Sequence, residues 1–312
     1  MNNVSSLSLL AIDCKKAAKS IRCSIAATVN SQLADGVTIG LSGGVDSAVL
    51  ATVAKEALGS RRVQAFYLYD RTNRLPSCRN AQLLADQLKI SLVLHSIDTE
   101  MDEQRIYTPL IMRMILGSEI ITRRLSKGLF GAENPFVYTL RNGDFGNNRT
   151  SKFVYKELVN PVERAFCARH IYRRKYLEKI AIEQSNIVLG AANRSEIMVG
   201  WFVKDGIDDM VHSPLSCFYK TQIYQLAKFL HIPDEIIEQT ASPDMLRGVT
   251  DECAIGINYE AMDTILYGMD YGLLDEELIE AGVTREQIAY VRKLNKLSEW
   301  KRSARKNPSG SP

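Results

Sequence analysis

A short glycine-rich turn carries the strongest chemical signal in the sequence, Ser42-Gly43-Gly44-Val45-Asp46-Ser47. Glycines let the backbone approach an anion closely, and free N–H groups at the start of a helix suit a pyrophosphate. The hydroxyls of Ser42 and Ser47 add hydrogen-bond donors. Asp46 would repel phosphate unless Mg²⁺ lies between them, because hard cations prefer oxygen ligands. The turn therefore predicts a site for a nucleotide phosphate and Mg²⁺, and a plain glycine turn with a helix-capping Asp is the structural alternative.

The elements that would position this turn follow the pattern of a doubly wound parallel α/β sheet. Apolar, β-branched runs predict strands, and Ala-rich or amphipathic runs predict the helices between them. The predicted strands span residues 37–41, 63–69, 91–97 and 186–190. The predicted helices around them span residues 12–33, 46–58, 80–88 and 163–183. Strands that alternate with helices form a parallel sheet with helices on both faces, and the turn follows the first strand.

The middle and the end of the chain lie outside that alternating pattern. Residues 101–125 predict one long helix, and residues 128–152, with four glycines and an Asn-Asn pair, predict an extended loop or lid. Further helices are predicted over residues 221–230, 234–238, 259–267, 275–281 and 285–297, with a frayed end at 307–312. We expect a main domain over residues 1–266, with 102–160 as an insertion or lid, and a helical C-terminal extension over 267–312.

Composition limits the class of protein. The chain of 312 residues is 46% hydrophobic and 24% charged, a globular balance that excludes a disordered or fibrous chain. No apolar run approaches the ~18–20 residues that span a bilayer, and the first residues show no signal-peptide pattern. Six cysteines occur without C-x-x-C spacing, so neither a zinc ribbon nor a thioredoxin-type pair is predicted. These features predict a cytoplasmic protein with free thiols.

Charge is unevenly spread, although the net charge is only +3. Residues 101–180 hold 15 Lys and Arg against 8 Asp and Glu, and the tail from Tyr290 is also basic. Such segments either bind polyanions or form solvated helical faces, and both interpretations stay open. The small net charge does not by itself favour a nucleic-acid partner.

The turn and the segments after it resemble a known family. The string S-G-G-x-D-S resembles the loop of the N-type ATP pyrophosphatases, which cleave ATP between the α and β phosphates and adenylate a substrate. That superfamily includes NAD, GMP and asparagine synthetases and tRNA thiolation enzymes. Later segments resemble the ammonia-dependent NAD synthetases in matching order over most of residues 10–305. They are Val188 to Glu196, Gly200 to Phe202, Pro214-Leu215, Lys220 to Gln222, Ser242-Pro243-Asp244, Thr250 to Glu252 and Gly256 to Tyr259. The resemblance implies an adenine nucleotide alpha hydrolase-like fold.

The resemblance also implies roles for single residues. The turn residues Ser42, Gly43, Gly44, Asp46 and Ser47 would hold the phosphates of ATP, with Asp46 on Mg²⁺. Glu196 would supply a second carboxylate to the metal, Lys220 would contact the α-phosphate or the adenylate, and Ser242 would contact phosphates. Each has a plain alternative: Glu196 as a helix-capping acid, Lys220 as a surface lysine and Ser242 as an N-cap.

The reaction implied by the resemblance has two steps. The carboxylate of deamido-NAD attacks the α-phosphorus of ATP, which gives an acyl-adenylate and pyrophosphate. Ammonia then displaces AMP and forms the amide. Only about 40 residues precede the turn, so an amidotransferase domain is not expected, and the nitrogen would come from free ammonia or from a separate glutaminase. The family also implies a homodimer.

Two departures from the family pattern concern the acid substrate. Where the family has a T-K-Y-G-D-G-like stretch, Val203 and Ile207 replace a hydroxyl and an acid, and Asp208 is displaced by one residue. Trp300 replaces a His. Three alternatives therefore stay open: the same ligase chemistry on a different carboxylic acid, a tRNA-modifying ATP pyrophosphatase, and a non-catalytic ATP-binding homologue.

Overall fold

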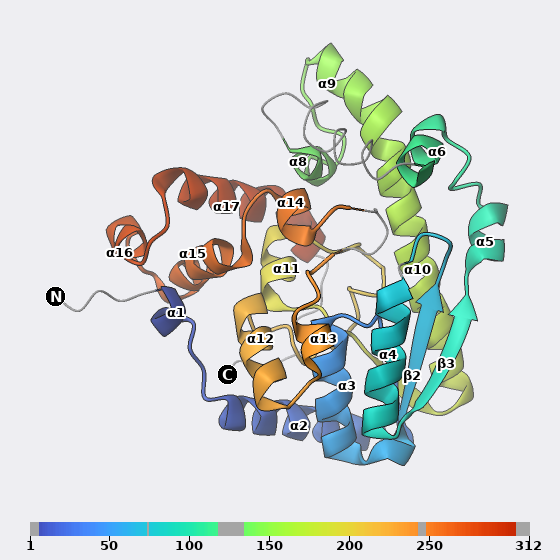
Figure 1. Ribbon diagram of the computed structural model, residues 1–312. Helices are drawn as coiled ribbons and strands as arrows, with labels where there is room; N and C mark the ends of the chain where they lie inside the picture. Colours follow the sequence, from blue (N-terminus) through green and yellow to red (C-terminus); the bar gives the residue numbers. More distant parts are fainter. Residues whose placement is uncertain (1–5, 74, 118–133, 243–247, 304–312) are drawn as a thin grey trace.

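A parallel four-stranded sheet in the order β3-β2-β1-β4 lies at the centre of the protein (Figure 1). The computed structural model describes residues 6–73, 75–117, 134–242 and 248–303. The strands are β1 (Gly36–Gly40), β2 (Val63–Tyr69), β3 (Ser91–Ser96) and β4 (Asn186–Leu189). In the register of the sheet, Thr38 of β1 lies between Gln64 of β2 and Val188 of β4. The predicted parallel α/β sheet is confirmed.

Helices cover both faces of this sheet. On one face, α3 (Val45–Leu58) and α4 (Leu75–Leu88) connect β1 to β2 and β2 to β3. The long α10 (Asn160–Glu183) lies on the other face and leads the chain back to β4. Successive residues of a strand point to opposite faces of the sheet, so each face has its own apolar core. Val37 and Ile39 of β1 pack in the core around α3, whereas Phe66 and Leu68 of β2 pack with α10. Right-handed connections on opposite faces therefore place β4 beside β1.

A layer of helices packs outside α3. It comprises α2 (Cys14–Ser31), α12 (Lys220–Phe229) and α13 (Asp234–Ile237). The helix α2 buries Ala18, Ile21, Ile25 and Val29, a spacing of three and four residues that gives one apolar face. The side chain of Asp13 caps its start by accepting from the backbone N–H of Lys16 at 3.0 Å. The predicted helix over residues 12–33 is therefore confirmed, and the Asp13 cap sets the start of α2.

The C-terminal helices form a second apolar core with helices from earlier in the chain. This core joins α15 (Tyr259–Tyr271), α16 (Asp275–Glu280) and α17 (Arg285–Leu297) to α8 (Pro135–Leu140) and α11 (Arg194–Val199). Short helices complete the region: α1 (Ser6–Leu9), α14 (Asp251–Ile255) and α18 (Glu299–Arg302). The predicted division between residues 266 and 267 falls inside α15 and stays a prediction.

The middle segment differs from the sequence prediction. In place of one helix over residues 101–125, the chain forms α5 (Asp98–Glu103) and α6 (Leu110–Gly117). Between them Arg105 adopts φ 54°, and Pro109 directly precedes α6, so one continuous helix is excluded. Residues 118–133 lie outside the described part of the chain.

The predicted loop over residues 128–152 is also partly wrong, because it holds two short helices, α8 and α9 (Arg149–Val154). Each begins at an asparagine cap: Asn134 accepts from the backbone N–H of Phe136, and Asn148 accepts from that of Ser151, both at 2.9 Å. Asparagine marks helix starts as well as turns, which explains the error. One π-helical turn (Tyr155–Val159) then joins α9 to α10.

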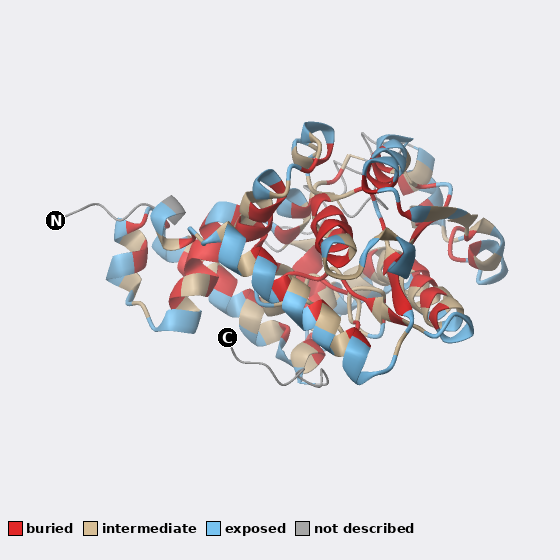
Figure 2. Cartoon of the chain, turned by 90° about the horizontal axis from the view of Figure 1, so that it is seen from below, coloured by how far each residue is buried: buried red, intermediate tan, exposed pale blue. Residues whose placement is uncertain are grey.

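Each of these helices has a buried side and an exposed side. Figure 2 shows buried residues gathered along the inward faces of the helices and exposed residues on their outer faces.

Within the described residues, none of the helices combines the length and the apolar character that a membrane span requires. The predicted frayed end, residues 307–312, lies outside the described part.

Candidate active site

The glycine-rich turn leads from the end of β1 into the start of α3, as predicted. Gly44 is the N-cap residue of α3, and its N–H donates to Oγ of Ser42 at 3.3 Å. The two hydroxyl oxygens, of Ser42 and Ser47, lie 3.1 Å apart, and the Ser47 hydroxyl also donates to the carbonyl of Gly44 at 3.0 Å. These bonds hold both hydroxyls against the backbone of the turn, where a phosphate at the helix start would lie.

Gly43 is required by the shape of this turn. Its φ is 81°, in the left-handed region that favours glycine. A β-carbon at this position would lie 2.1 Å from the carbonyl oxygen of Ser77, the third residue of α4. The turn can therefore pack against α4 only if residue 43 has no side chain.

The segment after β4 brings Glu196 to the same place. Asn193 is the buried N-cap of α11, and its Oδ1 accepts from the backbone N–H of Glu196 at 3.0 Å. Its Nδ2 donates to Oδ1 of Asp46 at 2.8 Å. The order of the sheet reverses between β1 and β4, and ligands of open α/β sheets bind at the carboxyl ends of strands at such a reversal. The fold thus explains why these two acids meet.

Lys220, the first residue of α12, lies between the two acids. Its Nζ donates to Oδ2 of Asp46 and lies 3.7 Å from Oε1 of Glu196. The Lys220 side chain is only 3% exposed, so it is not the surface lysine of the plain alternative. The three predicted catalytic residues, Asp46, Glu196 and Lys220, are therefore brought together.

A buried polar network holds the start of α12 against α11. The Ser195 hydroxyl accepts from the backbone N–H of Lys220 at 2.8 Å and donates to Oδ1 of Asp263 at 2.5 Å. Oδ2 of Asp263 accepts from the backbone N–H of Thr221 at 2.8 Å. Burial raises the pKa of Asp263 to about 6. The network positions the backbone from which the Lys220 side chain extends.

The cluster holds more negative than positive charge. Burial alone would lower the pKa of Lys220, but the carboxylates of Asp46, Glu196 and Asp251 outweigh it and raise that pKa, so the lysine stays charged. Burial and the neighbouring Asp46 raise the pKa of Glu196 well above its usual value. Three acids around one lysine therefore form a site that favours an additional cation.

Asp251 and Asn193 are members of this cluster to which the sequence analysis gave no role. Asp251 is the first residue of α14, and its Oδ2 accepts from the hydroxyl of Tyr259 at 3.1 Å. Its buried Oδ1 has no hydrogen-bond partner in the described part of the chain, and burial raises its pKa to about 6. The spacing Asn193-x-x-Glu196 matches a capping box and could have indicated the Asn193 cap. Asp251 lies in the segment Thr250 to Glu252 that resembles the family, but that resemblance was not used to give this residue a role.

Ser242, the remaining predicted phosphate contact, lines the same cavity. Its hydroxyl donates to the backbone carbonyl of Val249 at 3.1 Å. The neighbouring residues of its motif, Pro243 and Asp244, lie outside the described part of the chain. A contact between Ser242 and phosphate stays a prediction.

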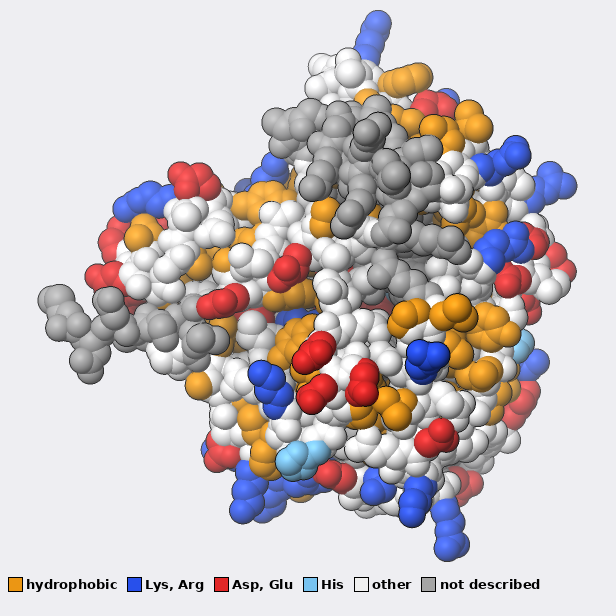
Figure 3. All heavy atoms as spheres, viewed as in Figure 1, with side chains coloured by type: hydrophobic (Ala, Val, Ile, Leu, Met, Phe, Trp, Pro, Cys, Tyr) orange, Lys and Arg blue, Asp and Glu red, His pale blue; other side chains and the backbone are white. Residues whose placement is uncertain are grey.

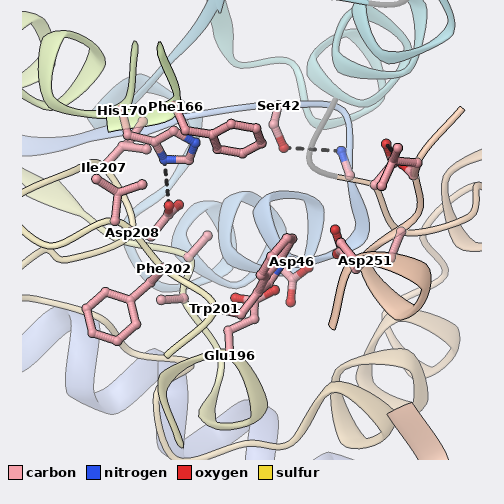
Figure 4. Close-up of a pocket in the computed structure, with 18 of the residues that line it drawn as sticks. Ser42, Asp46, Phe166, His170, Glu196, Trp201, Phe202, Ile207, Asp208 and Asp251 are labelled. Atoms are coloured by element: carbon pink, nitrogen blue, oxygen red, sulfur yellow. Dashed lines mark hydrogen bonds and ion pairs between the residues drawn. The ribbon is translucent and has the colours of Figure 1, made fainter. Parts of the chain in front are cut away.

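The acids, Lys220 and the turn line one end of a cavity of about 500 Å³. The other end is lined by aromatic and apolar side chains from α10 and from the segment after α11, and Figure 4 shows both ends. The side chains labelled at that other end are Phe166, His170, Phe202, Ile207 and Asp208, whereas Trp201 is drawn beside Asp46 and Glu196. The cavity therefore joins a charged phosphate end to a largely apolar end, which suits a nucleotide and a second substrate.

The C-terminal helix α18 supports the apolar end. Nζ of Lys301 donates to the carbonyl oxygens of Gly200 and Phe202 at 3.0 and 2.8 Å, and burial lowers the pKa of this lysine. The indole N–H of Trp300 donates to the carbonyl oxygen of Leu140 at 2.9 Å. Trp300 is therefore part of the cavity wall in place of the histidine of the family pattern.

Ion pairs account for part of the basic character of the middle segment. On α10, Arg174 pairs with Glu178 at 2.7 Å, and the fully buried Arg169 lies 3.5 Å from Asp70. Figure 3 shows Lys and Arg interspersed with Asp and Glu on the face that it presents. The Arg174–Glu178 pair agrees with a solvated helical surface, whereas the Arg169–Asp70 pair is internal.

Comparisons with known proteins agree on one family. The NAD synthase family model matches residues 17–108 and 148–305. The NH(3)-dependent NAD(+) synthetase of Thermotoga maritima is 29% identical over 85% of this chain and 89% of its own length. The enzyme of the same name from Coprothermobacter proteolyticus is 30% identical over 80% of this chain and 82% of its own length.

Solved structures show the same fold. The structure of NMN synthetase from Francisella tularensis matches with a TM-score of 0.69 and 21% identity, over 97% of this chain and 99% of the other. The NH3-dependent NAD synthetase from Campylobacter jejuni matches with a TM-score of 0.65 and 20% identity, over 97% and 100% of the two chains. These structures confirm the predicted α/β fold.

Proposed function

The chain belongs to the NAD synthase family, and on that premise we propose that it makes an amide from deamido-NAD and ammonia at the expense of ATP. It is an NAD synthetase-like ligase with ATP as a substrate. One observation carries the assignment of the site: Lys220 joins Asp46 of the phosphate turn to Glu196 at the end of the cavity. A structural glycine turn would not require a buried lysine between two acids from distant segments.

The residues of the site suit the first step. The backbone N–H groups of the turn, with Ser42 and Ser47, would bind the phosphates of ATP. Lys220 would lie at the α-phosphate, where its charge stabilises the negative charge that develops as the carboxylate attacks. Pyrophosphate leaves, and the acid is held as an acyl-adenylate. Ammonia then attacks the carbonyl carbon, and AMP leaves with the electron pair of the broken C–O bond.

Asp46 and Glu196 would hold Mg²⁺. The donor set fits, because two carboxylates in a region of excess negative charge offer the hard oxygen ligands that Mg²⁺ prefers. Among the described residues no group of three His, Cys, Asp or Glu could hold a metal ion. Mg²⁺ usually takes one or two carboxylates together with substrate phosphates and waters, so a two-carboxylate site agrees with a metal that arrives with ATP. When bound, such an ion neutralises charge on the phosphates.

The identity of the acid rests on family resemblance. A second acid is favoured by two observations: Val203 and Ile207 replace polar residues of the family pattern, and a structure with the same fold is that of an NMN synthetase. The corresponding acid for this chain would be the mononucleotide whose amide is NMN. We retain deamido-NAD as the first candidate, because the curated relatives at 29–30% identity are NAD(+) synthetases.

Other parts of the proposal follow from the family and from composition. We place the reaction in the cytoplasm, in agreement with six free cysteines. We also propose a homodimer. Free ammonia would be the nitrogen source, and a separate glutaminase is the alternative.

A purified-protein assay tests the function. The protein is incubated with ATP, Mg²⁺ and ammonium, and with deamido-NAD, the mononucleotide acid or neither. Formation of NAD, AMP and pyrophosphate only with deamido-NAD supports the proposal. Products only with the mononucleotide acid would assign the second candidate, and no acid-dependent AMP with either would contradict both.

A further inference from the structure

A histidine and an aspartate form a pair at the apolar end of the cavity. Nδ1 of His170, on α10, lies 2.6 Å from Oδ2 of Asp208, in the segment that follows α11. Figure 4 shows the pair facing the same cavity as Ser42, Asp46 and Glu196. The two side chains are 15% and 34% exposed, so the pair is partly shielded from solvent.

The backbone holds this pair beside the strand that carries the phosphate turn. The backbone N–H of Ile207 donates to the carbonyl oxygen of His170 at 3.1 Å. A β-carbon at Gly40, the last residue of β1, would lie 2.8 Å from Cδ1 of Ile207. Ile207 therefore packs between the end of β1 and α10, and it fixes His170 near the turn that begins two residues after Gly40.

The pair occurs where this chain departs from its family pattern. Ile207 stands where the pattern has an acid, and Val203 stands where it has a hydroxyl. Both residues line the cavity, and their side chains cannot accept a proton. A reaction that uses ammonia at neutral pH must move protons from nitrogen, because ammonium has no free electron pair. The reaction therefore needs a proton acceptor in the cavity, which Val203 and Ile207 cannot supply.

His170 has the properties of such a proton acceptor. Asp208 forms an ion pair with the ring at Nδ1, which leaves Nε2 as the second nitrogen of the ring. The ring of Phe166 lies nearly parallel to it, with centroids 6.1 Å apart and an interplanar angle of 14°. An imidazole that a carboxylate orients through one nitrogen can accept a proton at the other.

We propose that His170, oriented by Asp208, is the general base that takes a proton from ammonium and so frees the lone pair that attacks the acyl-adenylate. The proposal rests on the proposed ligase function and adds a residue to it. His170 would be the catalytic residue of the second step, and Asp208 a positioning residue that acts through it.

The step balances as follows. Nε2 of His170 takes one proton from ammonium, and the lone pair that this frees forms the new C–N bond at the carbonyl carbon. A second proton leaves that nitrogen to solvent. The C–O bond to the phosphate of AMP breaks, and AMP leaves with the electron pair. The products are the amide, AMP and an imidazolium, which then releases its proton to solvent.

The test separates the two half-reactions and compares two nucleophiles. The adenylation step is measured as acid-dependent exchange of pyrophosphate into ATP without ammonia. The second step is measured with ammonium and, separately, with hydroxylamine, which is largely unprotonated at neutral pH and traps acyl-adenylates as hydroxamates. The variants are His170→Gln and Asp208→Asn, and the matched control is His231→Gln, because His231 is exposed at the end of α12 and does not line the cavity.

For His170→Gln we expect exchange within about twofold of wild type and amide formation from ammonium lowered by about 100-fold or more, the range of general base catalysis. Hydroxamate formation should fall far less. Asp208→Asn should show the same preference for hydroxylamine with a smaller loss, and His231→Gln should match wild type.

Three results would overturn the proposal. Equal losses with ammonium and hydroxylamine would show that His170 only shapes the cavity. Amide formation by His170→Gln and Asp208→Asn at wild-type rates would show that neither residue takes part. An absence of acid-dependent exchange in the wild-type protein would contradict the ligase function itself, and this proposal with it, so the two failures are distinguishable.

Discussion

Asn193 donates a side-chain hydrogen bond of 2.8 Å to Asp46, which lies 147 residues earlier in the chain. The same amide accepts from the backbone N–H of Glu196 through its oxygen. One side chain therefore caps the helix that carries one acid and orients the other. An amide can do both, whereas an ionised carboxylate has no hydrogen atom to donate.

Substitution of Asn193 separates these two roles. Asn193→Asp keeps an acceptor for the helix cap but adds a fourth carboxylate to the cluster of Asp46, Glu196 and Asp251. We expect near-wild-type folding and at least a tenfold loss of acid-dependent pyrophosphate release. Asn193→Ala should lose that activity and also about 1 kcal/mol of the free energy of unfolding.

Urea unfolding and a pyrophosphate assay measure both quantities. Thr284→Ala is the matched control, because Thr284 caps α17 at a distance from the cavity. It should lose a similar free energy of unfolding and keep its activity. An active Asn193→Asp enzyme would contradict the orienting role.

Gly43→Ala should damage the phosphate turn more than its backbone angle alone explains. Gly59 has almost the same φ, 82° against 81°, but a β-carbon there would meet nothing within 4 Å. Gly59 has an extended ψ of 157°, so Gly59→Ala measures the cost of a positive φ without a clash, about 1–3 kcal/mol. Gly43→Ala adds a clash with Ser77, and we expect a larger loss of stability together with loss of ATP binding. Thermal unfolding with and without ATP compares the pair, and equal losses would refute the packing argument.

Asp46→Ala should abolish pyrophosphate release. The substitution removes the carboxylate that pairs with Lys220 and that would bind Mg²⁺. The negative charge on the α-phosphate is then no longer balanced. Asp234→Ala, an exposed acid at the start of α13, is the control and should retain wild-type rates. Measurable turnover by Asp46→Ala at saturating Mg²⁺ would show that this carboxylate is dispensable.

Ser42→Ala should weaken ATP binding with less effect on the chemical step. Its hydroxyl lies 3.1 Å from that of Ser47 and helps to form the phosphate turn, but it carries no charge to the α-phosphate. We expect KM for ATP to rise about tenfold or less, with kcat changed by a smaller factor. Steady-state kinetics at varied ATP decides this, and a fall in kcat with unchanged KM would indicate a role in the transition state.

Asp263 gives a prediction for pH. Burial raises its pKa to about 6 in the folded protein, against about 3.9 in an unfolded chain. The folded protein therefore takes up this proton at a higher pH than the unfolded chain, so the group favours folding more strongly as pH falls from about 7 to about 4. Asp263→Asn removes this contribution. The difference in the free energy of unfolding, wild type minus variant, should grow as pH falls, by at most about 1.4 kcal/mol per pH unit.

Urea unfolding at pH 7, 6 and 5 measures that difference. An exposed acid supplies the control: for Asp234→Asn the difference should change little over the same range. A difference for Asp263→Asn that shrinks towards low pH would have the wrong sign for a buried carboxyl with a raised pKa.

The elements around the phosphate turn could be predicted because their signals are local. The strand over residues 63–69 and the helix over 285–297 have the bounds that their patterns predict, and Gly59 ends α3 as a glycine stop. The middle segment could not be predicted in this way. Asn134 and Asn148 indicate turns by composition, and only the packing of α8 against the C-terminal helices makes it a helix in a core.

The sequence by itself predicted the phosphate turn and Asp46 from residue type and short spacing, and it indicated Glu196 and Lys220 through the resemblance to a family. Only the tertiary structure decided which side chains from different elements meet. The pairs are Lys220 with Asp46, Asp251 with Tyr259 of the following helix, and His170 with Asp208. The physical reason is the strand order. Since α10 crosses the face opposite to α3, β4 lies beside β1, and the residues after both strands converge on one cavity.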